Sequence, residues 1–485
     1  MKKSNALERL RAGERLTAGQ QLLLIFQLSI PAVLAQLSSI VMQYIDAAMV
    51  GSLGETKSAS IGLVSSSTWL FGGLCSAAAV GYTVQIAHRI GHGEEGEARK
   101  LVKMGLLFCA LFGFLLLGIG AGLSFPLPAL LGGEESVRTD SSLYFLVFSL
   151  FLPVRALNYA SAGALQGSGN IKFPGAMEIL MCALDVLFNF ALIFPTREVT
   201  LFGARFTVYG AGLSVAGAAL GTGLAEASAT LALLAFLLFG SKPLRLRRSE
   251  KFVFEKSYFK EALRLSLPVG FEQGILSGAQ IVSTAIVAPL GNVAIAANSF
   301  AVTAESLCYM PGYGIGTAAT TAVGQSVGAG RKDLVKRLGW TATLFGIAVM
   351  SVTAVLAYFL APYLIGVLTP VEEIRTLGVT VLRLELFAEP MYAASIVASG
   401  VFRGAGDTLV PSAFNFCSMW LVRLPLAALL SASLGLKGVW IAMAIELTVR
   451  GILFLIRLAG KGWQKRCTQN AEQGSSKEES TPPSN

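Results

Sequence analysis

Charged residues are scarce in this sequence. Lys, Arg, Asp and Glu make up 14% of its 485 residues, whereas a soluble chain carries about 25%. Hydrophobic residues reach 54%, and the mean hydropathy is +0.64. This balance excludes an ordinary soluble domain and predicts an integral membrane protein. Residues 1–20 are polar and charged, so a cleavable signal peptide is not evident.

Patterns typical of catalysis and metal binding are also missing. The six cysteines are scattered without a CxxC pair, and we expect them to be reduced. His88 and His92 lie among basic and acidic neighbours, which predicts a solvated loop rather than a metal site. The sequence contains no HExxH motif, nucleophile elbow or P-loop. We therefore expect no enzyme activity, no cofactor and no ATP-driven pump within this chain.

Apolar runs of about 20 residues are abundant and predict membrane-spanning helices. The first six are expected at 27–53, 60–88, 102–128, 141–165, 174–195 and 212–239. The second six are expected at 264–290, 295–326, 336–360, 377–401, 411–434 and 438–459. Residues 196–209 carry two β-prone stretches around Gly203, which predict a short external hairpin.

Glycine and proline recur at a constant offset of 237 residues. The pairs are Pro31 and Pro268, Gly54 and Gly291, Gly91 and Gly328, Gly93 and Gly330, Pro153 and Pro390, Gly163 and Gly400, Gly167 and Gly404, Gly169 and Gly406, and Pro174 and Pro411. These residues mark where helices begin, end, kink or pack closely. The repeat predicts an all-α integral membrane protein whose 12 transmembrane helices form two repeated six-helix bundles.

The chain divides into five parts on this interpretation. They are a cytoplasmic N-terminal segment (1–20), an N-lobe (21–240), a basic cytoplasmic linker (241–262), a C-lobe (263–460) and a disordered cytoplasmic tail (461–485). Of the 38 Lys and Arg, 28 fall on the side of the termini, six on the opposite side and four within or beside the membrane. The positive-inside rule therefore predicts a plasma (inner) membrane protein with both termini in the cytoplasm. The net charge of +9 fits contact with anionic lipids and is no evidence for nucleic acid.

Four stretches resemble multidrug and toxic compound extrusion (MATE) transporters. They are Asp46 to Gly54, Leu165 to Gly169 with the following Pro174, Gly324 to Gly330, and Phe402 to Thr408. The resemblance covers about residues 20 to 460. It implies a V-shaped pair of six-helix bundles that exports cationic or other amphiphilic small molecules in exchange for Na⁺ or H⁺. We expect a monomer.

Carboxylates inside the membrane are the candidate functional groups, because each costs about 2.5–3.5 kcal/mol to insert. Asp46 shares one helical face with Gln36, Ser39 and Gln43, and Asn189 follows Asp185 by one turn. We expect Asp46, Asp185 and Asn189 to couple transport to an ion and to be the ligands if that ion is Na⁺. A buried polar network between helices is the alternative. Relatives often carry Asn where this chain has Met181, one turn before Asp185, so the chain departs from the family at one position of the expected Na⁺ shell.

The second half carries different acids. Glu272 follows Pro268 by four residues, and we also expect it to take part in ion coupling. The expected cavity or substrate contacts are Gln36, Gln43, Tyr44, Gln280, Glu305, Tyr313 and Glu389. Glu385 and Glu389 have an alternative role as ion-pair partners of Arg383. Glu226 and Glu446 sit at similar places in the two halves, which favours a structural role.

A lipid-linked oligosaccharide flippase of the same superfamily remains the alternative function. Its cavity would need Arg and Lys for a pyrophosphate, whereas the clearest intramembrane charges here are acidic. None of four candidate acids has an acidic counterpart at the 237-residue offset: Asp46, Asp185, Glu272 and Glu305. We therefore expect the shared Gly and Pro residues to define the scaffold, and the ion site to lie where the halves differ.

Overall fold

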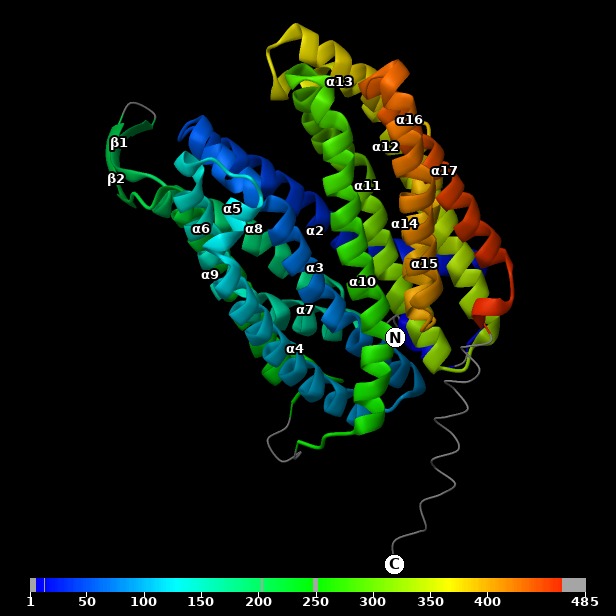
Figure 1. The fold of residues 1–485 in the computed structure, drawn as a ribbon. Helices are drawn as coiled ribbons and strands as arrows, with labels where there is room; N and C mark the ends of the chain where they lie inside the picture. Colours follow the sequence, from blue (N-terminus) through cyan, green and yellow to red (C-terminus); the bar gives the residue numbers. More distant parts are fainter. Residues whose placement is uncertain (1–5, 13, 202–203, 247–251, 465–485) are drawn as a thin grey trace, which may run out of the picture.

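Two helical bundles diverge from a shared end in the computed structural model (Figure 1), which describes residues 6–12, 14–201, 204–246 and 252–464. The N-lobe contains α2 (Ala18–Gly51), α3 (Glu55–His92), α4 (Glu95–Leu123), α5 (Pro126–Leu130), α6 (Glu135–Leu150), α7 (Leu152–Gly167), α8 (Lys172–Leu192) and α9 (Ser214–Ala235). The C-lobe contains α10 (Lys256–Val287), α11 (Asn292–Gly328), α12 (Lys332–Leu368), α13 (Glu372–Glu385), α14 (Glu389–Gly404), α15 (Leu409–Cys417), α16 (Leu424–Leu434) and α17 (Leu436–Ala459). The predicted all-α membrane fold with two lobes is confirmed.

The expected spans differ in length, continuity and apolar character. Ten helical spans in the described chain are long and apolar enough to cross a membrane, and α6 with α7 forms an eleventh that bends by 44°. The expected span 377–401 is instead divided between α13 and α14 by the break at Leu386–Ala388. Charged residues within α13 and at the start of α14 explain why this pair lacks the apolar character of the others.

The backbone confirms the internal repeat. Three glycine pairs at the 237-residue offset share positive φ angles, a conformation that favours glycine: Gly54 (113°) and Gly291 (96°), Gly93 (90°) and Gly330 (67°), and Gly169 (92°) and Gly406 (80°). Helix packing repeats as well, because α2 packs on α11 of the other lobe while its counterpart α10 packs on α3. The two lobes are therefore related copies that meet face to face.

The seam between the lobes is tied by equivalent residues. His88 Nε2 lies 2.8 Å from the Gly404 carbonyl oxygen, and Gln325 Nε2 donates to the Gly167 carbonyl at 2.8 Å. His88 and Gln325 are 237 residues apart, as are Gly167 and Gly404. The prediction of a histidine loop is wrong, since both histidines lie in the last turns of α3. The predicted solvation holds for His92, which is exposed and whose Nδ1 lies 3.0 Å from the Gly328 carbonyl oxygen, but not for His88.

Close helix approach at this end requires glycine on both sides. A Cβ at Gly91 would overlap the backbone of Gln325, and a Cβ at Gly328 would overlap the backbone of His88. Arg11 in the short helix α1 (Ala6–Arg11) adds a further link, donating to the Ser168 carbonyl at 2.9 Å and to Gln325 Oε1 at 3.1 Å. The lobes are therefore in contact at the end that carries α1.

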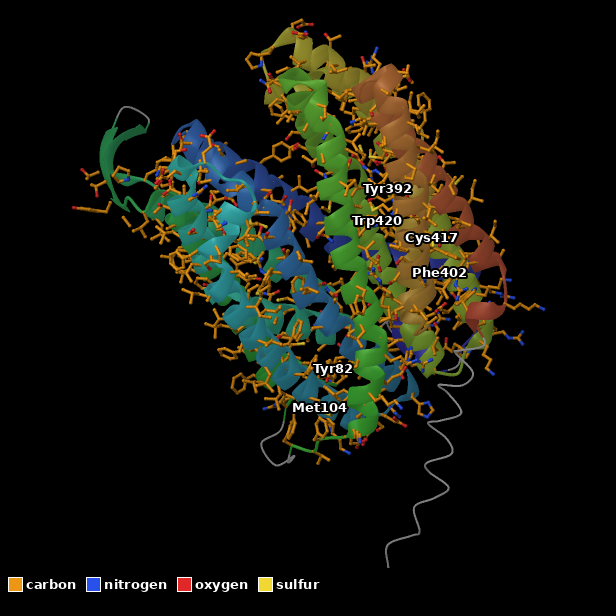
Figure 2. All side chains as sticks on the ribbon, viewed as in Figure 1. Tyr82, Met104, Tyr392, Phe402, Cys417 and Trp420 are labelled. Atoms are coloured by element: carbon orange, nitrogen blue, oxygen red, sulfur yellow. The ribbon has the colours of Figure 1, made fainter. Side chains whose placement is uncertain are left out.

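Apolar cores fill both lobes, and one of them includes residues of both. Tyr82 and Met104 belong to the N-lobe core near the end where the lobes are in contact (Figure 2). Phe402 belongs to a C-lobe core that also includes residues of α2 (Figure 2). The cysteines of the described chain are free thiols, as expected. Cys467 lies outside the described residues.

The predicted hairpin is confirmed. Strands β1 (Pro195–Leu201) and β2 (Ala204–Ala211) pair antiparallel, with Val199 opposite Phe206. Figure 1 places the hairpin at the end of the N-lobe opposite the start of α10. Most of the expected disordered tail, from residue 465 on, lies outside the described residues, as does part of the expected linker.

Candidate functional site

Asn189 lies at the centre of the N-lobe site. Its Nδ2 donates to Asp46 Oδ1 at 2.8 Å and to Asp185 Oδ2 at 3.1 Å. Asp46 comes from α2, while Asp185 and Asn189 come from consecutive turns of α8. The sequence predicted a shared role for these three residues. The structure brings them together from two separate helices.

Two further oxygens at this site have no partner. Asp185 Oδ1 and Asn189 Oδ1 are buried, and neither makes a hydrogen bond within the described chain. Asp185 and Asn189 are both 0% exposed. Gly221 on α9 permits this arrangement, because a Cβ there would overlap the Asn189 carboxamide. Carboxylate and carboxamide oxygens without donors suit a small hard cation or a shared proton.

Sequence reasoning missed a third acid of the N-lobe, Glu178 on α8. Ser39 Oγ donates to Glu178 Oε1 at 2.9 Å, which joins the polar face of α2 to α8. Glu178 precedes Asp185 by seven residues, or two helical turns, so the helical period could have found it. The polar face of α2 thus meets carboxylates of α8 at two positions, Glu178 and Asp185, which are two helical turns apart.

Two other acids form ion pairs with arginine, in agreement with a structural role. Arg155 on α7 holds Glu226 on α9 through Nη2 at 2.9 Å and Nε at 3.0 Å. In the second lobe, Arg450 Nε lies 3.1 Å from Glu446 Oε1 one turn away on α17. Each pair is largely buried, so its charges balance inside the lobe.

Glu272 occupies a separate polar site in the C-lobe. Its carboxylate accepts hydrogen bonds from Ser412 Oγ at 2.7 Å and Asn415 Nδ2 at 2.6 Å, and Arg403 Nη2 lies 3.7 Å away. The residues of this site come from α10, α14 and α15. Glu272 is therefore held by C-lobe partners and does not complete the N-lobe site.

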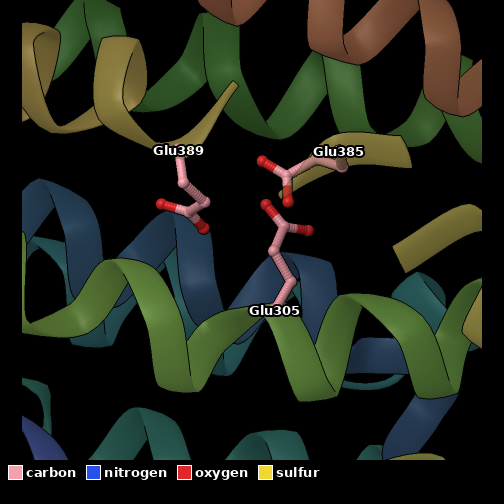
Figure 3. A group of neighbouring side chains, drawn as sticks. All are labelled: Glu305, Glu385 and Glu389. Atoms are coloured by element: carbon pink, nitrogen blue, oxygen red, sulfur yellow. The ribbon is translucent and has the colours of Figure 1, made fainter. Parts of the chain in front are cut away.

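Glu305 and Glu389 meet Glu385 in a buried group (Figure 3). The alternative of an ion pair with Arg383 is not borne out, because Arg383 Nε donates to the Tyr358 carbonyl at 3.1 Å. Glu305 and Glu389, predicted as cavity contacts, are thus enclosed within the C-lobe.

The other predicted cavity residues are more open. Gln43 and Gln280 are exposed, Gln36 and Tyr44 are half-buried, and Tyr313 is 39% exposed. The Tyr313 ring packs edge-on against Tyr309, with centroids 6.0 Å apart. These side chains are available to a ligand or to lipid, and they lie on the same helices as the acids: α2, α10 and α11.

A membrane fold of two repeated lobes with buried carboxylates is typical of a transporter. The MatE family model matches residues 31–191 and again 268–429, so its two matches begin 237 residues apart. The chain belongs to the MatE family, a family of multi-pass membrane transporters.

Named relatives match along almost their full length. A probable multidrug resistance protein NorM from Thermotoga maritima is 29% identical over 463 residues, covering 93% of this chain and 94% of the relative. The multidrug resistance protein MdtK from Yersinia pestis is 26% identical, covering 89% and 93%.

Solved structures support the fold. A MOP superfamily transporter from Pyrococcus furiosus aligns with a TM-score of 0.84 at 19% identity, covering 96% of this chain and 99% of that one. The Vibrio cholerae MATE transporter VcmN in its bent form aligns with a TM-score of 0.78 at 17% identity, covering 93% and 98%.

Proposed function

We propose that this chain is a secondary active efflux transporter that exports cationic or amphiphilic small molecules by antiport with Na⁺ or H⁺. The multidrug resistance names of its relatives support this class of substrate. The observation that carries the proposal is the joining of Asp46 to Asp185 through Asn189. Two carboxylates that share one carboxamide donor need a cation or a proton to balance their charge in a membrane.

Helix α2 links the ion site to the seam between the lobes. At Pro31 to Val33 its backbone is approached closely by Gly175 of α8 and by Gly314 of α11. Asp46 lies 13 residues beyond Val33 on the same helix, about 20 Å along its axis. Neutralising Asp46 removes its repulsion from Asp185, and α2 then changes its packing against α11. Alternating access follows from this shift, with Glu272 as a second ion-coupling acid in the C-lobe.

The charge distribution of the sequence indicates the membrane location and orientation of the protein. We propose a plasma (inner) membrane location with both termini cytoplasmic, a monomer in contact with membrane lipids, and no nucleic-acid partner. The flippase alternative has little support. Neither of the two relatives named above carries a flippase name. In the described chain, the buried carboxylates of Asp185, Glu385 and Glu389 each have at least one oxygen without a hydrogen-bond donor.

Transport in proteoliposomes tests the proposal. The purified chain is reconstituted, and a fluorescent organic cation is followed while a Na⁺ gradient or a pH gradient is imposed separately. We expect one of the gradients to drive movement of the organic cation against its own gradient. Failure of both gradients, in vesicles that contain folded protein, would overturn the proposed function.

A further inference from the structure

A basic hollow lies where the first turn of α2 meets the start of α12. Its volume is about 690 Å³, within the range of roughly 300–1,000 Å³ that is usual for ligand sites. Ala18 and Gln21 of α2 contribute to its lining, and so do residues from the first three turns of α12. Gln464, beyond the end of α17, completes it. The hollow therefore lies between a helix of the N-lobe and the C-lobe.

Positive charge dominates this lining. Lys332, Lys336 and Arg337 contribute three cations, against one acid, Asp333. The Nε of Arg331 lies 3.0 Å from Asp333 Oδ1, so this acid is already paired outside the lining cations. Lys332 and Arg337 are exposed, and neither has an ion-pair partner in the described chain. The hollow thus presents two unpaired cations to an anion.

Lys336 supplies a third cation at a fixed position. Its Nζ donates to the Ala459 carbonyl at 3.1 Å, which ties the start of α12 to the end of α17. A lysine ammonium carries three donors, so two of them stay available for the oxygens of a phosphate. The Ala459 carbonyl carries no formal charge, and the charge of Lys336 is therefore not cancelled.

One face of α12 changes from basic to aromatic to apolar. Trp340 follows Lys336 by four residues and Leu344 follows Trp340 by four more, so successive members lie about 6 Å apart along the helix axis. Trp340 lines the hollow, whereas Leu344 is 56% exposed. Tryptophan is typical of the boundary between lipid headgroups and acyl chains. The order along this face therefore matches the order of parts in a phospholipid.

We propose that the hollow binds the phosphate headgroup of an anionic membrane phospholipid, with phosphatidylglycerol as the simplest example. Basic pockets between membrane helices on the cytoplasmic side suit anionic headgroups, and this end of α12 is the proposed cytoplasmic end. A zwitterionic headgroup carries its own cation and would leave the lysines and Arg337 without a counter-charge. The bound headgroup touches α2 and α12 together, so it ties the first turn of α2 to the C-lobe.

Quenching of Trp340 fluorescence by brominated lipid tests the site. The full-length protein is placed in phosphatidylcholine nanodiscs that contain increasing, matched fractions of brominated phosphatidylglycerol or brominated phosphatidylcholine. The Trp340 signal is the difference between the wild type and Trp340→Phe. We expect half-maximal quenching at a fraction of phosphatidylglycerol about tenfold lower than that of phosphatidylcholine, because basic residues near the membrane surface attract anionic lipid.

Paired substitutions locate the lipid. Lys332→Gln combined with Arg337→Gln removes the two unpaired cations and should reduce the preference to less than about twofold. Lys256→Gln combined with Lys260→Gln is the matched control, because it removes two exposed cations from the first turns of α10 and should retain the preference. The Tm of each variant identifies an unfolded protein. If the first double variant does not fold, Arg337→Gln alone is measured in its place.

Three outcomes would contradict the proposal. Equal quenching by the two brominated lipids in the wild type would overturn the site. An unchanged preference in the variant that lacks Lys332 and Arg337 would place the lipid elsewhere. Excess inorganic phosphate at constant ionic strength should not reverse the quenching, and reversal would show that the hollow binds a soluble anion instead of a lipid.

Discussion

Asn189 on α8 donates a hydrogen bond of 2.8 Å to Asp46 on α2, across 143 residues of sequence. The same nitrogen also donates to Asp185, so one carboxamide holds two acids together. Because α2 also packs on α11 of the other lobe, a change of charge at Asp46 has a direct route to the seam.

Crowding Asn189 should uncouple transport. The substitution Gly221→Ala places a methyl group against the Asn189 carboxamide, and we expect it to cost about 1–3 kcal/mol in stability and to lower gradient-driven transport at least tenfold. Transport in vesicles and the Tm are measured together. Gly118→Ala on α4 is the matched control, because its Cβ meets nothing within 4 Å. A Gly221→Ala variant that transports like Gly118→Ala would contradict the geometry.

The Arg155–Glu226 pair should matter for stability. Glu226→Gln leaves the Arg155 charge without its partner inside the lobe, so we expect a loss of about 3–5 kcal/mol in the free energy of unfolding. Denaturation in detergent checks the value. Asp140→Asn breaks the more exposed pair with Lys57 and should cost less than about 1 kcal/mol. Equal losses would show that burial of the first pair is unimportant.

Separating the lobes at the end that carries α1 should change the populations of the two conformations that alternating access requires. Gly328→Ala forces a methyl group against the His88 backbone, so we expect the lobes to separate at the end that carries α1. Spin labels at Glu95 and Lys332 report the distance between the lobes. Gly96→Ala is the control, since its Cβ meets only the tip of Arg99 at 3.9 Å. Unchanged distance distributions in Gly328→Ala would show that the seam tolerates the methyl group.

Much of the fold was accessible from the sequence, because apolar length and repeated Gly and Pro report local constraints. The pairing of Asp46 with Asp185 was predicted only as a shared role, since helical period places residues on a face but does not say which helices face each other. Glu178 was within reach of the same reasoning.

The histidine seam was not accessible. His88 looks solvated by its neighbours in sequence, and only the tertiary approach of Gly404 gives it a partner. The Glu305, Glu385 and Glu389 group depends likewise on a break between two helices, and hydropathy alone does not reveal that break.

The central claim is that Asp46 couples an ion gradient to transport. The most direct measurement compares wild type and Asp46→Asn in proteoliposomes, with gradient-driven movement of a fluorescent organic cation and its equilibrium binding recorded on the same preparation. We predict that Asp46→Asn folds and still binds the organic cation, but that neither a Na⁺ gradient nor a pH gradient drives its transport. Gradient-driven transport at the wild-type rate in Asp46→Asn would contradict the account.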